Sequence, residues 1–209
     1  AIVNLGLFVV ASYAALLVVL LVHSLILAGV GVNPITYFKK AFPVLSFAFT
    51  ARSSAGALPL NVETQTKALG VDVASANFAA SFGLSIGQNG CAGVYPAMLA
   101  TIVAPTLGID VTSIGFVLTL ILVVTISSFG VAGVGGGATF AALIVLGAMN
   151  LPVTIAGLVI SVEPVIDMMR TLTNVNDSML AGVVSSRNIG EFDSSILNDN
   201  AAVVDGDAI

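Results

Sequence analysis

The chain has 209 residues, of which 57% are hydrophobic and only 8% are charged. Soluble domains carry about 25% charged residues, so this composition excludes a soluble domain and predicts an integral membrane protein. The net charge is -5, and the six Lys and Arg residues form no patch, which excludes a nucleic-acid partner. The single cysteine excludes an internal disulfide. Because the sequence opens inside an apolar run, we expect a fragment whose missing N-terminal part holds further spans.

The basic residues predict the orientation in the membrane. They are Lys39, Lys40, Arg52, Lys67, Arg170 and Arg187. Lys and Arg concentrate on the cytoplasmic side of membrane proteins. This rule places residues around 33–70 and the tail beyond 185 in the cytoplasm, and the turn at 106–112, which has no Lys or Arg, outside.

The first half of the chain predicts one full span, one hairpin and one interrupted span. Residues 1–32 form a transmembrane helix, because the apolar run can cross about 30 Å of hydrocarbon. Residues 33–72 hold two short apolar segments joined at Ser53-Ser54, which predicts a first re-entrant hairpin. Residues 73–105 form a broken transmembrane helix, because Gly87-Gln88-Asn89-Gly90 favours unwinding and unwound backbone in a bilayer lines a cavity. A simply kinked helix is the alternative.

The second half repeats this order. Residues 106–150 predict a second re-entrant hairpin, with a glycine-rich tip at about 130–137. Residues 151–186 predict a transmembrane helix with a polar face, and residues 187–209 an acidic cytoplasmic tail, mostly disordered and without a site. The two hairpins enter from opposite sides of the membrane. Interrupted segments in two inverted halves indicate a secondary transporter with a site near the middle of the membrane.

The polar face of the last span is the predicted floor of that site. At helical spacing these side chains share an arc of roughly 120°. They are Glu163, Asp167, Arg170, Thr171, Asn174, Asp177 and Ser178. Charged groups inside a membrane normally face a bundle interior or a wet cavity. The alternative is an Asp167–Arg170 ion pair that only holds helices together.

With these motifs, the chain resembles the dicarboxylate/amino acid:cation symporter family, the glutamate transporter homologues. The resemblance covers residues 5–185 and rests on the motifs at 52–59, 87–90, 130–137 and 167–175. The residue sequence around Gly87-Gln88-Asn89-Gly90 is most similar to that of the bacterial L-cystine uptake branch. The resemblance implies an all-α integral membrane transport core with two re-entrant helical hairpins and broken helices in inverted repeat. It also implies missing scaffold spans, a homotrimer at full length, and a multi-pass position in the bacterial inner membrane with the C-terminus cytoplasmic.

The resemblance also implies residue roles in substrate binding. Asp167 would bind the substrate ammonium, Arg170 a carboxylate at the far end of the substrate, and Asn174 the α-carboxylate. Thr171 would add a hydroxyl beside Arg170, and Arg52 would bias the conformational equilibrium. The two tips would complete the site with Ser53, Ser54, Val131, Ala132 and Gly133. A substrate with a single carboxylate would leave Arg170 unpaired, which favours a two-ended substrate.

The departures from the family pattern concern the coupling cation. This chain has Gly87-Gln88-Asn89-Gly90 where sodium-coupled members usually read Asn-Met-Asp-Gly, and Ser178 where they have an aspartate. Losing carboxylates weakens a hard-cation site. Coupling to Na⁺ or to a proton, with no other cofactor, stays open. The candidate cation-binding positions are Gly87, Asn89, Ser128, Glu163, Asn174, Asp177 and Ser178.

The sequence thus predicts a cation-coupled secondary transporter that takes up L-cystine by an elevator mechanism and is not an enzyme. The alternatives are a symporter for acidic amino acids or dicarboxylates and, more distantly, an ion or solute channel. Cys91 has no evident partner for catalysis, which argues against an intramembrane enzyme. For His23, a bond to a neighbouring helix or an interfacial position is favoured over a proton relay.

Overall fold

The computed structural model describes residues 2–131, 133 and 136–204, and every regular element in those ranges is helical. The predicted all-helical class is therefore confirmed for these residues. In chain order the elements are α1 (Ile2–Gly29), α2 (Pro34–Ala51), α3 (Leu58–Glu63), π-helical η1 (Thr64–Ala68), α4 (Val73–Gly83), π-helical η2 (Asn89–Val94), α5 (Tyr95–Val103), 3₁₀-helical η3 (Ala104–Leu107), α6 (Ile114–Ser128), α7 (Gly137–Ala148), α8 (Thr154–Val159), α9 (Glu163–Ile189) and α10 (Ser194–Asn198).

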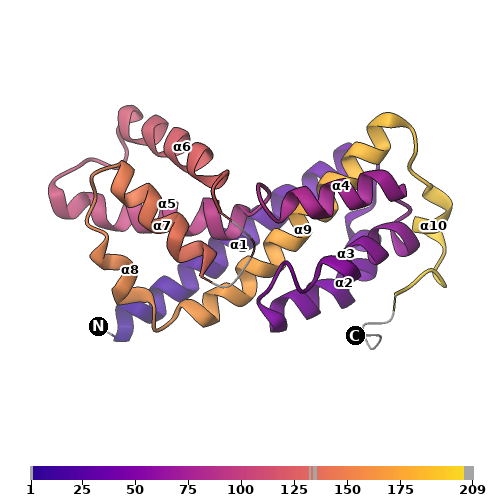
Figure 1. Ribbon diagram of the computed structural model, residues 1–209, viewed down its shortest axis with the longest axis horizontal. Coiled ribbons are helices and arrows are strands. Elements are labelled where there is room, and N and C mark those ends of the chain that lie inside the picture. Colours follow the sequence, from indigo (N-terminus) through magenta and orange to yellow (C-terminus); the bar gives the residue numbers. More distant parts are fainter. Residues whose placement is uncertain (1, 132, 134–135, 205–209) are drawn as a thin grey trace.

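Helices α1 and α9 run through the middle of an elongated molecule, and the other elements gather at its two ends (Figure 1). One end holds α2, α3, α4 and α10, and the other holds α5 to α8. Each end has its own apolar core: one includes Tyr37, Leu45 and Met179, and the other includes Phe8, Leu99 and Ile166. Helix α9 contributes Ile166 to one core and Val175 and Met179 to the other. The polar residues between Ile166 and Val175 therefore lie between the two cores.

Two helical stretches, Ile2–Gly29 and Asn89–Leu107, are long and apolar enough to cross a membrane by length and composition. Only 17% of the most apolar window of α1 is buried inside the protein. Leu7, Leu17 and Leu25 on this helix expose more than half of their side-chain surface. Such a helix needs an apolar solvent, and hydrocarbon supplies one.

The first hairpin consists of α2 and the α3–η1 segment. Asn33 caps α2 by accepting hydrogen bonds from the backbone N–H groups of Ile35 (2.9 Å) and Thr36 (3.4 Å), and Pro34 follows in the first turn. The helix ends at Arg52, whose φ of 51° is left-handed, and the chain then turns toward α3. The hydroxyl of Ser53 stabilises this turn by accepting from the Gly56 N–H at 3.0 Å. The sequence signals for a cap and a tight turn therefore fix the shape of this hairpin.

Two segments that the sequence predicts as single spans are interrupted in the structure. The chain leaves α4 after Gly83 and becomes helical again at Asn89, so the interruption at 84–88 begins three residues before the predicted one at 87–90 and overlaps it at Gly87 and Gln88. A second interruption, at residues 160–162, divides the segment predicted as one final span into α8 and α9. Pro164 lies in the first turn of α9, where its missing N–H costs no helical hydrogen bond. The polar helix therefore begins at Glu163 rather than near residue 153.

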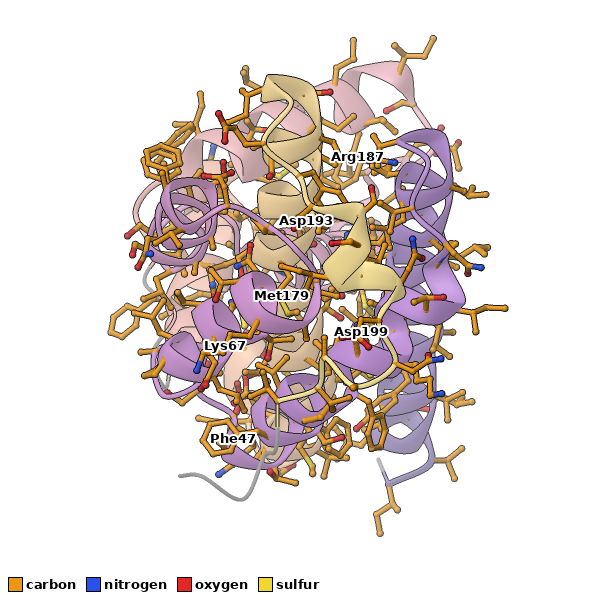
Figure 2. All side chains as sticks on the ribbon, turned by 90° about the vertical axis from the view of Figure 1, so that its right-hand side faces the viewer. Phe47, Lys67, Met179, Arg187, Asp193 and Asp199 are labelled. Atoms are coloured by element: carbon orange, nitrogen blue, oxygen red, sulfur yellow. The ribbon has the colours of Figure 1, made fainter. Side chains whose placement is uncertain are left out.

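The expectation of a mostly disordered tail is wrong for residues 187–204. Helix α9 continues to Ile189, and the chain then folds back against the first hairpin. The Nζ of Lys40 on α2 lies within hydrogen-bonding distance of the carbonyl oxygens of Ile196 (2.7 Å), Asp199 (2.7 Å) and Ala202 (3.0 Å), and also of Ala68 (3.0 Å). Figure 2 views this end, with Asp193 and Asp199 on the folded-back segment. Composition missed this segment because the groups that hold it, Lys40 and the apolar core around Leu197 and Val204, are distant in sequence or are few apolar residues in a polar stretch.

Candidate functional site

The tips of the two hairpins meet each other and the interruption after α4. The backbone N–H of Ala55 in the first tip donates to the carbonyl oxygen of Gly133 in the second tip at 3.3 Å. The N–H of Gly133 in turn donates to the carbonyl oxygen of Leu84 at 2.7 Å. A Cβ at Gly133 would lie 3.1 Å from the side chains of Gln88 and Ser54. The second tip can approach this closely because residue 133 has no side chain.

A small cavity lies under these tips and above α9. Its lining residues are Arg52, Ser54, Gln88, Cys91, Gly133, Asp167, Thr171 and Asn174. The cavity volume is about 10 Å³. This volume holds about one water molecule, whereas sites for small molecules measure about 300–1,000 Å³. The site is therefore closed, and an amino acid fits only after the tips move.

Arg170 pairs with Asp167, which lines this cavity, and is completely buried. Its Nη2 donates to the carboxylates of Glu163 and Asp167, the latter at 3.1 Å, and its guanidinium carbon lies 4.4 Å from the centre of the Tyr95 ring. Both acids belong to α9 itself, so this ion pair does not join two helices, which argues against the purely structural alternative. The Nε and Nη1 of Arg170 have no hydrogen-bond partner among the described residues. Arg170 therefore keeps donors for a further anionic group.

Asn174 connects α9 to the interrupted segment. Its Oδ1 accepts from the Gly90 N–H at 2.8 Å, and its Nδ2 donates to Gln88 Oε1 at 2.9 Å and lies 3.1 Å from Cys91 Sγ. Close backbone packing makes this possible, since a Cβ at Gly90 would lie 2.7 Å from the Arg170 carbonyl oxygen. The amide assigned to the substrate carboxylate therefore already contacts protein groups, and a bound carboxylate would have to replace Gln88 or Cys91 at Nδ2.

The structure brings together some of the predicted substrate residues and not others. Ser54, Gly133, Asp167, Thr171 and Asn174 line the cavity, whereas Arg170 is not among its lining residues and reaches it only through its pair with Asp167. The Ser53 hydroxyl stabilises its own turn, and Val131 packs in an apolar cluster. Ala132 lies outside the described residues. Gln88 and Cys91 also line the cavity but were not predicted as substrate residues, although Gln88 lies within the glycine-bounded motif that signalled the interruption and Cys91 follows it directly.

The candidate cation positions fall in more than one place. Glu163 pairs with Arg170, whereas Asp177 pairs with His23 of α1 about 21 Å further along α9, at 1.5 Å per residue. The Asn89 N–H donates to Asp177 at 3.3 Å, and Gly87 and Asn89 line a cavity beside it.

The two serines proposed as cation ligands bond to protein groups. The Ser178 hydroxyl accepts from Asn61 Nδ2 at 2.7 Å. The hydroxyl of Ser128 donates to Thr125 O at 2.7 Å, on the exposed side of α6. The described residues contain no group of three or more His, Cys, Asp or Glu side chains able to hold a metal ion.

Comparison with known proteins identifies the family of the chain. The model of the sodium:dicarboxylate symporter family matches residues 1–188. The L-cystine uptake protein TcyP of Bacillus cereus is 65% identical over 200 residues, which cover 96% of this chain and 43% of that protein. The proteins of the same name from Shouchella clausii and Bacillus licheniformis are 61% and 60% identical, over 95% and 99% of this chain. The chain spans less than half the length of these relatives. The chain belongs to the sodium:dicarboxylate symporter family.

Proposed function

We propose that this chain is the substrate-binding core of a secondary transporter that takes up L-cystine. The observation that carries the proposal is the closed cavity formed by the two hairpin tips, Asp167 and Asn174. The relatives named as L-cystine uptake proteins support cystine as the substrate. A site built on Asp167 and Arg170 has no nucleophile–base pair and fits binding rather than catalysis.

The unused donors of Arg170 support a substrate with two anionic ends. The α-carboxylate of one half would approach the tips and Asn174, and the carboxylate of the other half would take Nε and Nη1 of Arg170. Asp167, with 17% of its side chain exposed, is the acid that would face an ammonium group. Because the closed cavity is too small for this ligand, the second hairpin would open to admit it and close over it.

The remaining features of the proposal come from the family. The two hairpins would be re-entrant and related as inverted repeats, the core would move as an elevator, and Na⁺ or a proton would drive uptake. The whole protein would be a homotrimer in the bilayer of the bacterial inner membrane, with the C-terminus in the cytoplasm. The location of the two hairpins at opposite ends of α1 and α9 supports the inverted arrangement (Figure 1).

The test is radiolabelled cystine uptake by the whole transporter in proteoliposomes. Asp167→Ala should reduce uptake at least 100-fold, and Arg170→Lys, which loses the planar fork, should raise the KM for cystine at least tenfold. The matched control is Lys67→Ala, because Lys67 is exposed and, among the residues that the structure describes, its one salt-bridge partner is Glu63. Wild-type uptake in both site variants would reject this site.

Competition distinguishes cystine from the alternative substrates. Unlabelled cystine should inhibit uptake of labelled cystine at lower concentrations than aspartate or glutamate. If aspartate or glutamate competes more strongly than cystine, the protein is an acidic amino-acid symporter with the same site. Imposed Na⁺ and proton gradients in the same vesicles identify the driving ion.

A further inference from the structure

A second buried contact of a carboxylate lies on α9 away from the substrate cavity. His23 of α1 places its Nε2 2.7 Å from Asp177 Oδ1. Both side chains are 6% exposed, so water does not screen the contact. The charged groups nearest the substrate, Glu163, Asp167 and Arg170, pair with one another and do not compensate Asp177. His23 is therefore the side chain that faces the Asp177 carboxylate.

A hydrogen-bonded chain fixes the orientation of the His23 ring. The hydroxyl of Tyr37 on α2 donates to Asn176 Oδ1 at 2.9 Å. This bond turns the Asn176 Nδ2 toward His23 Nδ1, 2.8 Å away. With Nδ1 so engaged, Nε2 is the ring nitrogen that presents its N–H to Asp177. Side chains from α1, α2 and α9 therefore orient the His23 N–H toward the Asp177 carboxylate.

The second oxygen of Asp177 also faces a donor. Its Oδ2 accepts from the backbone N–H of Asn89 at 3.3 Å. A sodium ion needs several oxygen lone pairs directed at it, and N–H groups present the opposite polarity. The carboxylate that the sequence offers as a cation ligand is therefore turned toward two N–H groups.

Two cavities border this carboxylate. A cavity of about 560 Å³ lies between α1 and α9, and His23, Asn89 and Asp177 contribute to its wall. A cavity of about 190 Å³ on the α4 side of α9 is lined by Asp177 and Ser178. Space for a small ion therefore lies beside Asp177 on both sides, so the contact with the imidazole, and not a lack of space, is the feature that sets what binds there.

We propose that the His23 imidazole, with the proton it carries, takes the place of a sodium ion beside Asp177 and makes His23 the residue that determines which cation this position accepts. The inference deepens the proposed function and rests on it, because a coupling cation has meaning only in a transporter. Removing the ring leaves a buried carboxylate beside an enlarged cavity, and a monovalent metal ion would then compensate its charge.

The experiment measures thermal unfolding of the purified whole transporter in matched NaCl, KCl and choline chloride. A ligand that binds the folded state raises the Tm, so an added sodium site gives a Na⁺-specific shift. His23→Ala should show a Na⁺-specific rise larger than that of the wild type, and His23→Ala combined with Asp177→Asn should lose this gain. His23→Gln, which keeps an N–H donor near the carboxylate, should respond as the wild type does. Ser12→Ala is the control for removing a buried polar group from α1, since its hydroxyl bonds only within that helix.

Asp177→Asn alone keeps the inference testable if His23→Ala does not fold. We expect this variant to have the same Na⁺ response as the wild type, because no sodium ion binds this carboxylate in the native protein. A Na⁺-specific stabilisation of the wild type that Asp177→Asn removes would overturn the inference, as would an unchanged Na⁺ response in folded His23→Ala. Neither result depends on uptake, whereas failure of wild-type cystine uptake would reject the proposed function alone.

Discussion

The Ala55 N–H and the Gly133 carbonyl oxygen form a hydrogen bond of 3.3 Å between the tips of two hairpins. Gly133 also donates to Leu84, so one residue connects the second hairpin to the first tip and to the interrupted segment. This contact closes the cavity over Asp167 and Asn174. Because it consists of two backbone bonds, it can break and re-form as the second tip opens.

Bulk at Gly133 should hold the tips apart. Gly133→Val would press on Gln88 and Ser54, both 3.1 Å from an added Cβ, and should weaken cystine binding at least roughly tenfold, or about 1.4 kcal/mol. Gly130→Val is the matched control, because the nearest atom to its Cβ is 3.6 Å away, in ordinary contact. Isothermal calorimetry on the whole protein checks this. Equal binding by both variants would show that tip contact does not control affinity.

Two glycines in η2 should respond oppositely to alanine. A Cβ at Gly90 would lie 2.7 Å from the Arg170 carbonyl oxygen, so Gly90→Ala should separate η2 from α9 and cost about 1–3 kcal/mol. Gly93 has no atom within 4 Å of an added Cβ, and Gly93→Ala should be neutral or stabilising. Thermal unfolding in detergent compares them. A Tm for Gly90→Ala at or above that of Gly93→Ala would contradict the packing described here.

Lys40 should hold the folded-back tail in place. Lys40→Met removes the donors for three tail carbonyls, and each buried carbonyl left unpaired costs about 1–3 kcal/mol. Limited proteolysis should cut residues 190–204 at least tenfold faster in this variant. Lys39→Met is the control, because Lys39 is the adjacent residue and is exposed. Equal cleavage rates in the two variants would mean that other contacts hold the tail.

Acid should loosen α10 through its cap. Asp193 accepts from the backbone N–H (2.8 Å) and the hydroxyl (2.6 Å) of Ser195, and these bonds lower the pKa of its carboxyl. Because the pKa is lowered in the folded state, the ionised carboxyl stabilises the cap at pH values above its ordinary pKa of about 3.9. This contribution is lost as the pH falls toward the lowered pKa. Hydrogen exchange at the Ser195 amide should therefore accelerate between about pH 4 and 3 beyond its intrinsic pH dependence. Asp193→Asn keeps the cap but should lack this step, and a step in both proteins would assign it to another group.

Much of the local structure follows from short-range signals in the sequence. Asn33-Pro34 predicts the start of α2, and the structure shows the Asn33 cap there. The glycines of Gly87-Gln88-Asn89-Gly90 predict the interruption between α4 and η2. The division between α8 and α9 was missed, because the Pro164 signal lay inside a continuous apolar run and apolar composition does not distinguish one helix from two.

By itself, the sequence determined that this protein is an all-helical member of a membrane transporter family, with its polar groups gathered on one helix face. Hydrophobicity and helical period act over a few residues, so they can be read from the chain alone. Only the tertiary structure decided that Arg170 retains unused donors, that Lys40 fastens the tail, and that Asp177 faces His23. Such pairings depend on how each helix is rotated and shifted against its neighbours, and that register is set by the packing of many side chains at once.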